Sequence, residues 1–499
     1  MSERNPESGK LAPWKRWKWF GPMTRAKAVV VLAALFFVTN AVFVAADSMG
    51  KPGSCGPDCT RYDVVVIGSE VPGVLLAKAA REQGLRVVIL DPREKPGGEL
   101  IQGQMQVLDE PNDNRKRSLV QGEFKKLFDA YKAGTVRKHE DFERYFQRWI
   151  RGITLHSGIA IQSVEIVTAG TELSIRSLTY RNRNGRVLTV QARYWVENTD
   201  FNALTGRLGV KRIPGMESLY NGKKPDYMAA TYMIKLKKVN WAKLHRAILD
   251  DYPLRNVQQK YGPNTYVDWN FATGFSNLMT GYKPQDEQLR LRGLNITNQK
   301  NGEVIINGLL IYDVDPADPV SVATAIRKGR AEAPRVLAHL RKHLPGFEKA
   351  ELNGFPEYLY IRDYNRFETK YVLNERDVKE GRMFWDNVSI GGYAMDLQGT
   401  RAIPLGIGFG KPDRYGIPLR SFQLKEYDNV LVVGKNIGAT IKAYGSARIM
   451  ATTALAAETI GILLGRETHE NKRLSDLTPA DFRRFHAYLE KYKRIVLTR

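Results

Sequence analysis

The chain has 499 residues, 43% hydrophobic and 10% aromatic, which is the composition of a folded protein with two or three domains and not of a disordered chain. Its net charge of +23 suits an anionic membrane surface, a cell-wall polymer or an acidic substrate. Nucleic acid is disfavoured as a partner, because Lys and Arg are spread along the whole chain without a compact basic block or a zinc-finger spacing.

Residues 28–46 form an uncharged apolar run that predicts a transmembrane signal-anchor. Its 19 residues would span roughly 28 Å as a helix, about the thickness of the hydrocarbon core of a bilayer. Residues 1–27 contain seven basic and two acidic residues, whereas the linker 47–61 contains two of each. This asymmetry predicts a cytoplasmic tail and an extracytoplasmic catalytic part on the cell membrane. The alternative is a signal peptide that is cleaved near Ala46 to give a secreted protein.

The only two cysteines, Cys55 and Cys59, lie in the linker. In an exported chain the tight Gly-Pro turn between them favours a small disulfide. A redox-active pair that passes electrons to a cofactor is the alternative.

The next segment predicts a βαβ unit: a strand at 62–68, a helix at 72–83 and a second strand at 85–91. Gly68 allows a tight turn, Gly73 allows the helix to pack closely on the sheet, and Asp91 ends the second strand where an acid accepts from ribose hydroxyls. The helix N-terminus offers free N–H groups to a pyrophosphate. The arrangement is typical of dinucleotide binding.

Glu70 stands where the usual phosphate-binding turn has its middle glycine. A carboxylate that faced the phosphates would add bulk and like charge. We therefore expect its side chain to turn away, to lie at the start of the following helix and to accept a free N–H there, while the Ser69 hydroxyl contacts the phosphates.

The later elements return to the first domain only near the end of the chain. Charged helical sequence is predicted at 118–151, and alternating strands at 159–167, 173–181 and 186–198. Mixed sequence from 211 to 400 predicts an inserted domain. A buried strand at 429–436, a helix rich in small residues at 445–465 and a capped helix from Thr478 complete the chain.

Four segments together resemble the FAD-dependent oxidoreductase family of glutathione-reductase-type flavoproteins. They read VVVIGSEVPG near the start, VENTDFNALTG at 196–206, GRMFWDNVSIGGYAMD at 381–396 and DNVLVVGKNIGATIKAYGSARIM at 428–450. The last is the most specific, and the resemblance covers residues 62–465. A closing segment of this kind is expected for a flavin, whose ring reaches beyond the first domain.

The resemblance implies FAD as the cofactor and no metal site. The residues expected to contact FAD are Gly68, Ser69, Gly73, Asp91, Gly97, Gly98, Gly434, Gly445, Ser446, Arg448 and Met450. Residues Arg362, Arg366, Tyr371 and Tyr393 are expected to face the cleft between the domains.

The chain departs from the family pattern at two places, with Asn198-Thr199-Asp200 in place of a glycine-containing strand end and Gln398 where a histidine is common. The proton-transfer role of that histidine therefore cannot be transferred. The remaining candidates for catalysis are Arg366, Tyr393 and Asp396. His339 and His343 have ligand-like spacing, but they lie in a basic helix that is typical of a solvated face.

The expected fold is α/β, with a Rossmann-type FAD-binding domain built from both ends of the chain, an inserted α+β domain and an N-terminal transmembrane helix. The expected domain boundaries are 1–27, 28–46, 47–61, 62–210, 211–400, 401–466 and 467–499. The expected function is hydride exchange between a small-molecule substrate and flavin N5. The alternatives are a flavoprotein that passes electrons to a membrane quinone or wall partner, and a non-catalytic tethered binding protein.

Overall fold

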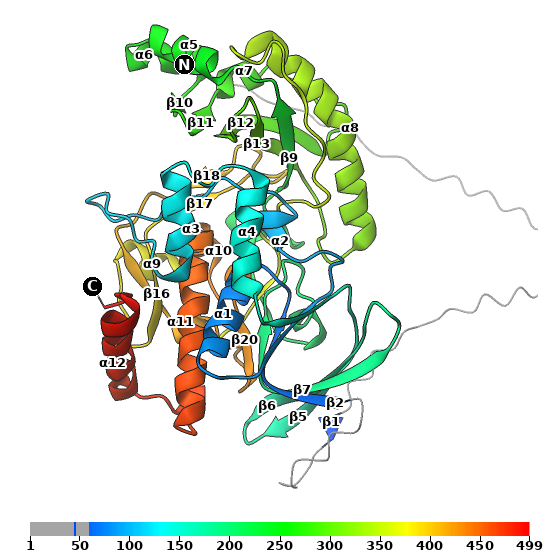
Figure 1. Ribbon diagram of the computed structural model, residues 1–499, viewed down its shortest axis with the longest axis vertical. Helices are drawn as coiled ribbons and strands as arrows, with labels where there is room; N and C mark the ends of the chain where they lie inside the picture. The colour runs from blue at the N-terminus through cyan, green and yellow to red at the C-terminus, as the bar shows by residue number, and fades with distance from the viewer. Residues whose placement is uncertain (1–43, 46–58, 499) are drawn as a thin grey trace, which may run out of the picture. The chain divides into compact units, whose positions relative to one another are not determined.

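A computed structural model describes residues 44–45 and 59–498 (Figure 1). The predicted cytoplasmic tail, residues 28–43 and 46 of the predicted membrane span, and the linker up to residue 58 lie outside the described residues. Val44 and Ala45 form a short strand, β1, that pairs in parallel with β5. Cys59 is disulfide-bonded, as the sequence predicts for the cysteine pair.

The first sheet contains the predicted βαβ unit and follows the order β1-β5-β6-β7-β2-β3-β4, with β20 also paired to β7. Strands β2, β3, β4, β20 and the C-terminal half of β7 form its parallel part. The bounds are β2 Cys59–Ile67, β3 Val87–Asp91, β4 Thr154–Ser157, β5 Ala160–Ala169, β6 Glu172–Arg181, β7 Val187–Glu197 and β20 Val430–Val432. The continuous apolar runs in β2, β3 and β20 suit strands that are covered on both faces.

The order of the parallel strands brings distant segments to one edge of the sheet. Because these strands run in the same direction, Gly68 after β2, Asp91 in β3, Asn198 after β7 and Gly434 after β20 all meet at their carboxyl ends. Ligands of open α/β sheets bind at this edge. The late strand is therefore part of the first domain, as the sequence predicts.

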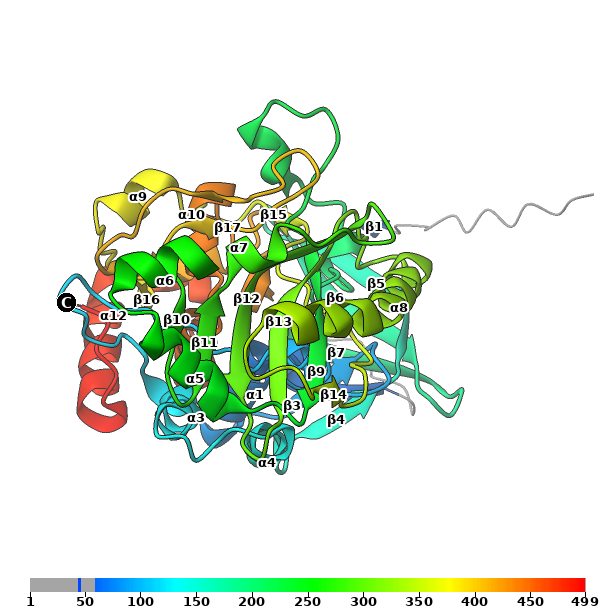
Figure 2. The same ribbon diagram turned by 90° about the horizontal axis from the view of Figure 1, so that it is seen from above.

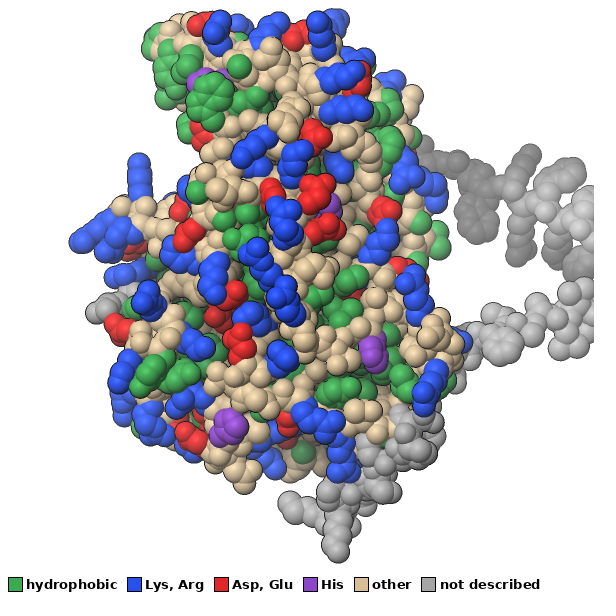
Figure 3. All heavy atoms as spheres, in the orientation of Figure 1, with side chains coloured by type: hydrophobic (Ala, Val, Ile, Leu, Met, Phe, Trp, Pro, Cys, Tyr) green, Lys and Arg blue, Asp and Glu red, His purple; other side chains and the backbone are tan. Residues whose placement is uncertain are grey.

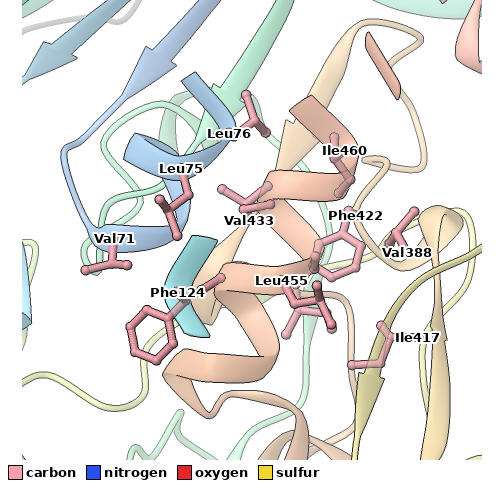
Figure 4. Close-up of a cluster of buried hydrophobic side chains, with 14 of the residues drawn as sticks. Val71, Leu75, Leu76, Phe124, Val388, Ile417, Phe422, Val433, Leu455 and Ile460 are labelled. Atoms are coloured by element: carbon pink, nitrogen blue, oxygen red, sulfur yellow. The ribbon is translucent and has the colours of Figure 1, made fainter. Parts of the chain in front are cut away.

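Helices α1 (Val71–Glu82) and α11 (Met450–His469) pack side by side against the sheet, with α3 (Gly122–Lys132) and α4 (His139–Ile150) beside them (Figure 1). Gly461 makes the close contact possible, because a Cβ there would lie 2.9 Å from Ala79 Cβ. The core between them is apolar, with Leu75 of α1, Phe124 of α3 and Leu455 of α11 among its buried side chains (Figure 4).

The second sheet is antiparallel and follows the order β10-β11-β12-β13-β9-β14. It lies above the first sheet in Figure 1 and in front of it in Figure 2, with α8 running across it. Its elements are β9 Ala230–Lys237, α5 Trp241–Asp250, α6 Leu254–Tyr261, β10 Tyr266–Val267, β11 Phe271–Gly274, α7 Ser276–Met279, β12 Leu289–Asn298, β13 Val304–Ile311, α8 Pro319–His343 and β14 Glu351–Leu352. All of them lie inside the range predicted for the inserted domain.

Short elements connect the two sheets. Three two-stranded ribbons pair β8 (Arg212–Ile213) with β15 (Arg366–Phe367), β16 (Asn387–Gly391) with β19 (Tyr415–Pro418), and β17 (Asp396–Leu397) with β18 (Ile407–Gly408). The short helices are α2 Gly98–Ile101, which begins in a segment predicted as a loop, and α9 Glu375–Lys379.

The predicted helix at 445–465 is two helices. Helix α10 (Ile441–Ala447) ends before α11 begins, and the two axes are bent by 84°. Among the helices of residues 59–498, none is long and apolar enough by itself to span a bilayer, and this bent pair alone passes that test when combined. Helix α12 (Pro479–Tyr488) is capped by Thr478, whose side chain accepts from the N–H of Asp481, as predicted.

The basic residues are distributed over the visible face of the molecule. Figure 3 shows Lys and Arg side chains over both sheets, interspersed with Asp and Glu. The spread of charge along the sequence is therefore also a spread in space on this face.

Candidate functional site

The turn after β2 requires its two glycines. Gly68 has φ +94°, and a Cβ there would lie 2.8 Å from Thr199 Cγ2 and 3.0 Å from the Asn198 carbonyl carbon. A Cβ on Gly73 would overlap the side chain of Asn198. Both glycines therefore allow the close approach that the sequence predicted for them.

Hydrogen bonds of Asp91 connect the turn after β2 to the loop after β3. Its carboxylate accepts from the Ser69 N–H at 3.0 Å, from the Ser69 hydroxyl and from the Arg93 N–H at 2.8 Å. The Ser69 oxygen in turn accepts from the Gly97 N–H at 2.9 Å. Burial raises the pKa of Asp91, although the Arg93 charge opposes the shift. The two predicted cofactor contacts, Ser69 and Asp91, are thus hydrogen-bonded to each other.

The side chain of Glu70 does not lie where we expected it. Glu70 is the N-cap residue of α1, but its side chain caps no N–H of that helix. It crosses to the loop after β3, where Oε2 accepts from the Glu99 N–H at 2.8 Å and Oε1 lies 2.8 Å from Arg93 Nη2. The prediction failed because the buried Arg93 offers a full charge, which attracts a carboxylate more strongly than a helix terminus does.

Glu70 belongs to a buried cluster of five charged side chains, which we call the turn cluster: Glu70, Arg93, Glu99, Asp200 and Lys435. Arg93 Nη2 also lies 3.1 Å from Asp200 Oδ1, and Lys435 Nζ lies 3.0 Å from Glu99 Oε2 and 3.8 Å from Asp200 Oδ2. The side chains of Arg93, Glu70 and Asp200 are 10%, 4% and 1% exposed.

Burial and mutual charge decide the protonation of the turn cluster. Burial would raise the pKa of Glu70, but the charges of Arg93 and Lys435 and the Glu99 N–H lower it below its ordinary value. Burial raises the pKa of Glu99 and Asp200 despite the same two cations. Among these three carboxyl groups, Glu70 is therefore the one whose pKa the two cations hold below its ordinary value.

A second polar group lies between the start of α11 and the second sheet; we call it the cleft cluster. It consists of Asp109, Tyr393, Arg448, Arg292 of β12 and the nearby Asp396 of β17. The Tyr393 hydroxyl lies 3.1 Å from Asp109 Oδ1, and Arg448 Nη2 lies 3.4 Å from the Asp396 carbonyl oxygen. The carboxylates of Asp109 and Asp396 and the guanidinium of Arg292 interact electrostatically. Two predicted catalytic residues, Tyr393 and Asp396, are thus brought together.

Arg366, the third predicted catalytic residue, is engaged inside the protein. Its guanidinium is ion-paired with Asp363, donates to the Ala439 carbonyl at 3.2 Å and stacks over the ring of Tyr444 at 4.0 Å. Only 1% of its side chain is exposed. It therefore does not face an open cleft as expected, and its contacts are those of a structural residue.

Two other residues expected at the cleft also have protein partners. Arg362 donates to the Ala229 carbonyl and to Thr231 Oγ1, the latter at 2.7 Å. The Tyr371 hydroxyl donates to Asp377 Oδ2 at 2.7 Å and lies outside the cleft cluster.

The remaining predicted cofactor contacts surround the bend between α10 and α11. Gly445 packs against β17, and a Cβ there would lie 3.0 Å from the Asp396 nitrogen. The Ser446 hydroxyl donates to the Tyr393 carbonyl at 2.6 Å. Met450 begins α11 and lines a small cavity.

The other predicted cofactor contacts, Gly97, Gly98 and Gly434, lie in the segments after β3 and β20. All three have positive φ, which a glycine adopts without strain.

The backbone fits a dinucleotide, whereas the side chains leave it little room in this conformation. The cavity between the two clusters has a volume of about 20 Å³ and is lined by Glu99, Asp109, Tyr360, Lys435, Arg448 and Met450, among others. That volume holds about one water molecule, and ligand sites measure roughly 300–1,000 Å³. FAD would be held by the turn at 68–73, by Arg93 and by the start of α11.

The sequence predicted Tyr393, Asp396 and Arg448 of the cleft cluster as site residues, but not Asp109 and Arg292, and it singled out neither Arg93, Glu99 nor Lys435 of the turn cluster. Arg93 lies two residues after Asp91 and Lys435 directly follows Gly434, so their positions beside carboxyl strand ends were a usable signal. Asp109 and Arg292 come from a loop and from a strand of the second sheet, and no motif marks them. Only the packing of the two sheets brings them together.

Comparison with known proteins identifies the family. The profile of the family described as FAD dependent oxidoreductase matches residues 63–488. No curated protein matches the chain.

Similar solved structures include a geranylgeranyl bacteriochlorophyll reductase-like protein from Thermoplasma acidophilum, with 11% identity, a TM-score of 0.37 and coverage of 87% of this chain and 85% of that one. A flavoprotein/dehydrogenase from Cytophaga hutchinsonii has 12% identity, a TM-score of 0.37 and coverage of 83% and 80%. The p-nitrophenol 4-monooxygenase of Pseudomonas putida DLL-E4 has 10% identity, a TM-score of 0.39 and coverage of 87% of each chain.

The family match extends over the whole nucleotide-binding half and the second sheet, including both clusters. The chain therefore belongs to the FAD-dependent oxidoreductases, a family of enzymes whose cofactor is FAD.

Proposed function

We propose that the protein is a membrane-anchored oxidoreductase that exchanges hydride between an acidic small molecule and flavin N5 outside the cytoplasm. The observation that carries this proposal is the cleft cluster, where polar groups from the first domain and the second sheet converge beside the start of α11. When bound, FAD supplies the hydride chemistry, and the protein supplies binding, orientation and proton transfer.

The hydroxyl of Tyr393 is the group best placed to hold a proton for the substrate. The Asp109 charge and burial raise its pKa, so the hydroxyl stays protonated at neutral pH. Burial also raises the pKa of Asp109, which accepts the hydrogen bond. Tyr393 can give the proton of its Oη to the substrate, and the phenolate left behind regains one from Asp109 when that buried carboxyl group itself carries a proton.

Two arginines favour a substrate with a carboxylate or a similar anionic group. The Nε atoms of Arg292 and Arg448 are buried and have no hydrogen-bond partner in the described part of the chain. Buried N–H donors are normally satisfied, so a ligand with acceptor oxygens would complete them. An adjoining pocket of about 650 Å³ is lined by Arg292, Leu310, Tyr312 and Gln398, among others, and can admit such a molecule.

The membrane anchor and the extracytoplasmic location rest on the sequence alone. The apolar run at 28–46 and the excess of basic residues before it support both. Anionic lipid or a cell-wall polymer is the partner that the net charge suits.

The proposed function is tested by anaerobic bleaching of the protein-bound flavin with a panel of carboxylic acids and matched neutral analogues. We expect bleaching by acids only. Tyr393→Phe should lower the bleaching rate about 10²-fold or more with little effect on substrate affinity, because it removes a proton donor. Tyr371→Phe is the matched control, because the Tyr371 hydroxyl is bound to Asp377 and lies outside the cluster.

Three results would contradict the proposal. Equal bleaching by neutral analogues would contradict the acidic substrate, and equal losses in the two tyrosine variants would contradict the role of Tyr393. If no substrate bleaches the flavin but a quinone reoxidises the photoreduced protein, electron transfer to a quinone is the function instead.

A further inference from the structure

The N–H and guanidinium groups beside Gly98, where the cofactor is expected to approach, already bind an anion of the protein itself. The Glu70 carboxylate accepts from the Glu99 N–H and pairs with Arg93, both at 2.8 Å. Carboxylate and phosphate oxygens accept from the same N–H and guanidinium donors. We propose that the Glu70 side chain is an internal ligand of the donor groups beside Gly98, Arg93 and the Glu99 N–H, and that FAD binds by displacing it. This inference rests on the FAD site of the proposed function.

The space around Gly98 is shaped for the carboxylate. A Cβ on Gly98 would overlap the carboxylate of Glu70. Position 98 therefore has to be a glycine for the Glu70 side chain to fit beside it. The sequence suggested that Gly97 and Gly98 allow a cofactor to approach. The structure shows that the same opening accommodates the side chain, so a cofactor and Glu70 would compete for one place.

The charges of the site also exclude simultaneous occupancy. Among the described residues, four neighbouring carboxyl groups (Glu70, Glu99, Asp200 and the adjacent Asp91) face two cations, Arg93 and Lys435. A pyrophosphate would add two further negative charges in a buried place, where like charges repel strongly. Removal of the Glu70 carboxylate from the turn lowers that cost and frees Arg93 for the phosphates.

Arg93 retains unused capacity for a larger anion. Its side chain is 10% exposed, yet Nε and Nη1 have no hydrogen-bond partner among the described residues. Glu70 and Asp200 both bind Nη2 and leave the other two nitrogens unpaired. A pyrophosphate has more acceptor oxygens than a carboxylate and can satisfy them.

The test measures FAD affinity of the flavin-free full chain by flavin fluorescence. We expect Glu70→Ala to bind FAD at least tenfold more tightly than the unsubstituted protein, because the competitor is gone. Glu70→Gln should lie between the two, since it keeps the size and loses the charge. If the Ala variant does not fold, the Gln variant carries the test.

Glu94→Ala is the matched control. Glu94 lies in the same loop, but its carboxylate is 68% exposed and pairs with Arg183. Glu94→Ala removes one negative charge, as Glu70→Ala does, but it leaves the Glu70 side chain in place. The FAD affinity of Glu94→Ala should therefore stay within about twofold of that of the unsubstituted protein.

Inorganic pyrophosphate separates this proposal from the proposed function. We expect it to raise the melting temperature of Glu70→Ala and not that of the unsubstituted protein or of Glu94→Ala. This result would support the internal ligand even if no form of the protein bound FAD, which would overturn only the proposed function. Weaker or unchanged FAD binding in both Glu70 variants, or equal stabilisation of all three proteins by pyrophosphate, would overturn the proposal.

Discussion

Gly73 lies where α1 approaches the end of β7, and Asn198 fills the space in front of it. The Asn198 amide donates to the Glu70 carbonyl at 3.0 Å, so the same side chain also fixes the turn. We expect Gly73→Val to lower the free energy of unfolding by at least about 2 kcal/mol and to abolish FAD binding, because the added methyl groups displace Asn198. Thermal unfolding and the flavin content of the purified protein check both effects.

Gly281→Val is the control for this substitution. No heavy atom lies within 4 Å of a Cβ at Gly281. Its stability and flavin content should therefore stay near those of the unsubstituted protein. Normal flavin content in Gly73→Val would show that the helix can pack on β7 without the glycine.

Among single residues, the sequence correctly predicted which glycines the turn needs, but it did not predict which groups the Glu70 carboxylate pairs with. The positions of Gly68 and Gly73 follow from backbone geometry, which a turn motif encodes locally. The position of Glu70 depends on Arg93 and Glu99, which follow β3, and on Lys435, which follows β20. Local sequence does not determine which of several carboxylates pairs with a buried cation.

A half-buried carboxylate of α11 forms a hydrogen bond to the start of α3. Glu458 Oε2 accepts from the Glu123 N–H at 2.6 Å at the start of α3, and burial raises its pKa from 4.5 to about 7. At pH values between 4.5 and about 7, Glu458 carries a proton in the folded protein and has lost it in the unfolded chain. The contribution of Glu458 to stability therefore falls as the pH rises through this window and is least favourable above about 7.

We expect Glu458→Gln to be more stable than the unsubstituted protein at pH 8, by roughly 1–3 kcal/mol, and nearly equal to it at pH 4.5. The amide oxygen can still accept from Glu123, while the cost of burying a charge is removed. Urea unfolding at the two pH values measures the difference. Glu82→Gln is the control, because that carboxylate is 47% exposed on α1. A lower stability of Glu458→Gln at pH 8 would show that the buried charge is net favourable.

The boundaries of elements were predicted less well than their existence. The strands at 62–68, 85–91 and 429–436 were correctly placed, because buried parallel strands are continuous apolar runs between turn residues. The predicted helix at 445–465 is broken at Arg448 and Ile449, since small residues such as Gly445 and Ser446 serve a close contact with β17 and not helix propensity. The sequence pattern around these residues does not reveal such a contact.

For the whole molecule, the first domain built from both ends could be predicted because each end carries a recognisable strand and glycine turn. In the cleft cluster, Tyr393, Asp396 and Arg448 were predicted, but Arg292 and Asp109 could not be, since they meet only after the second sheet has packed on the first. The topology in the membrane is still a prediction from residues 1–46.

A protease added to intact cells should cleave the protein after Ala46 and leave residues 10–27 protected, because the basic flank stays in the cytoplasm. Immunoblots with antibodies against each part measure this. Detergent-permeabilised cells are the control, in which both parts should be cleaved. Protection of the flavin domain in intact cells would reverse the orientation.

The pairing of α1 with α11 also sets the order in which the protein can be made. About 370 residues separate Glu82 from Met450, and a ribosome that adds roughly 5–20 residues per second needs about 20–75 s to bridge them. During that time the buried face of α1, including Val74 and Leu75, lacks its contacts with α11. The first domain therefore completes its core only after nearly the whole chain has been translated.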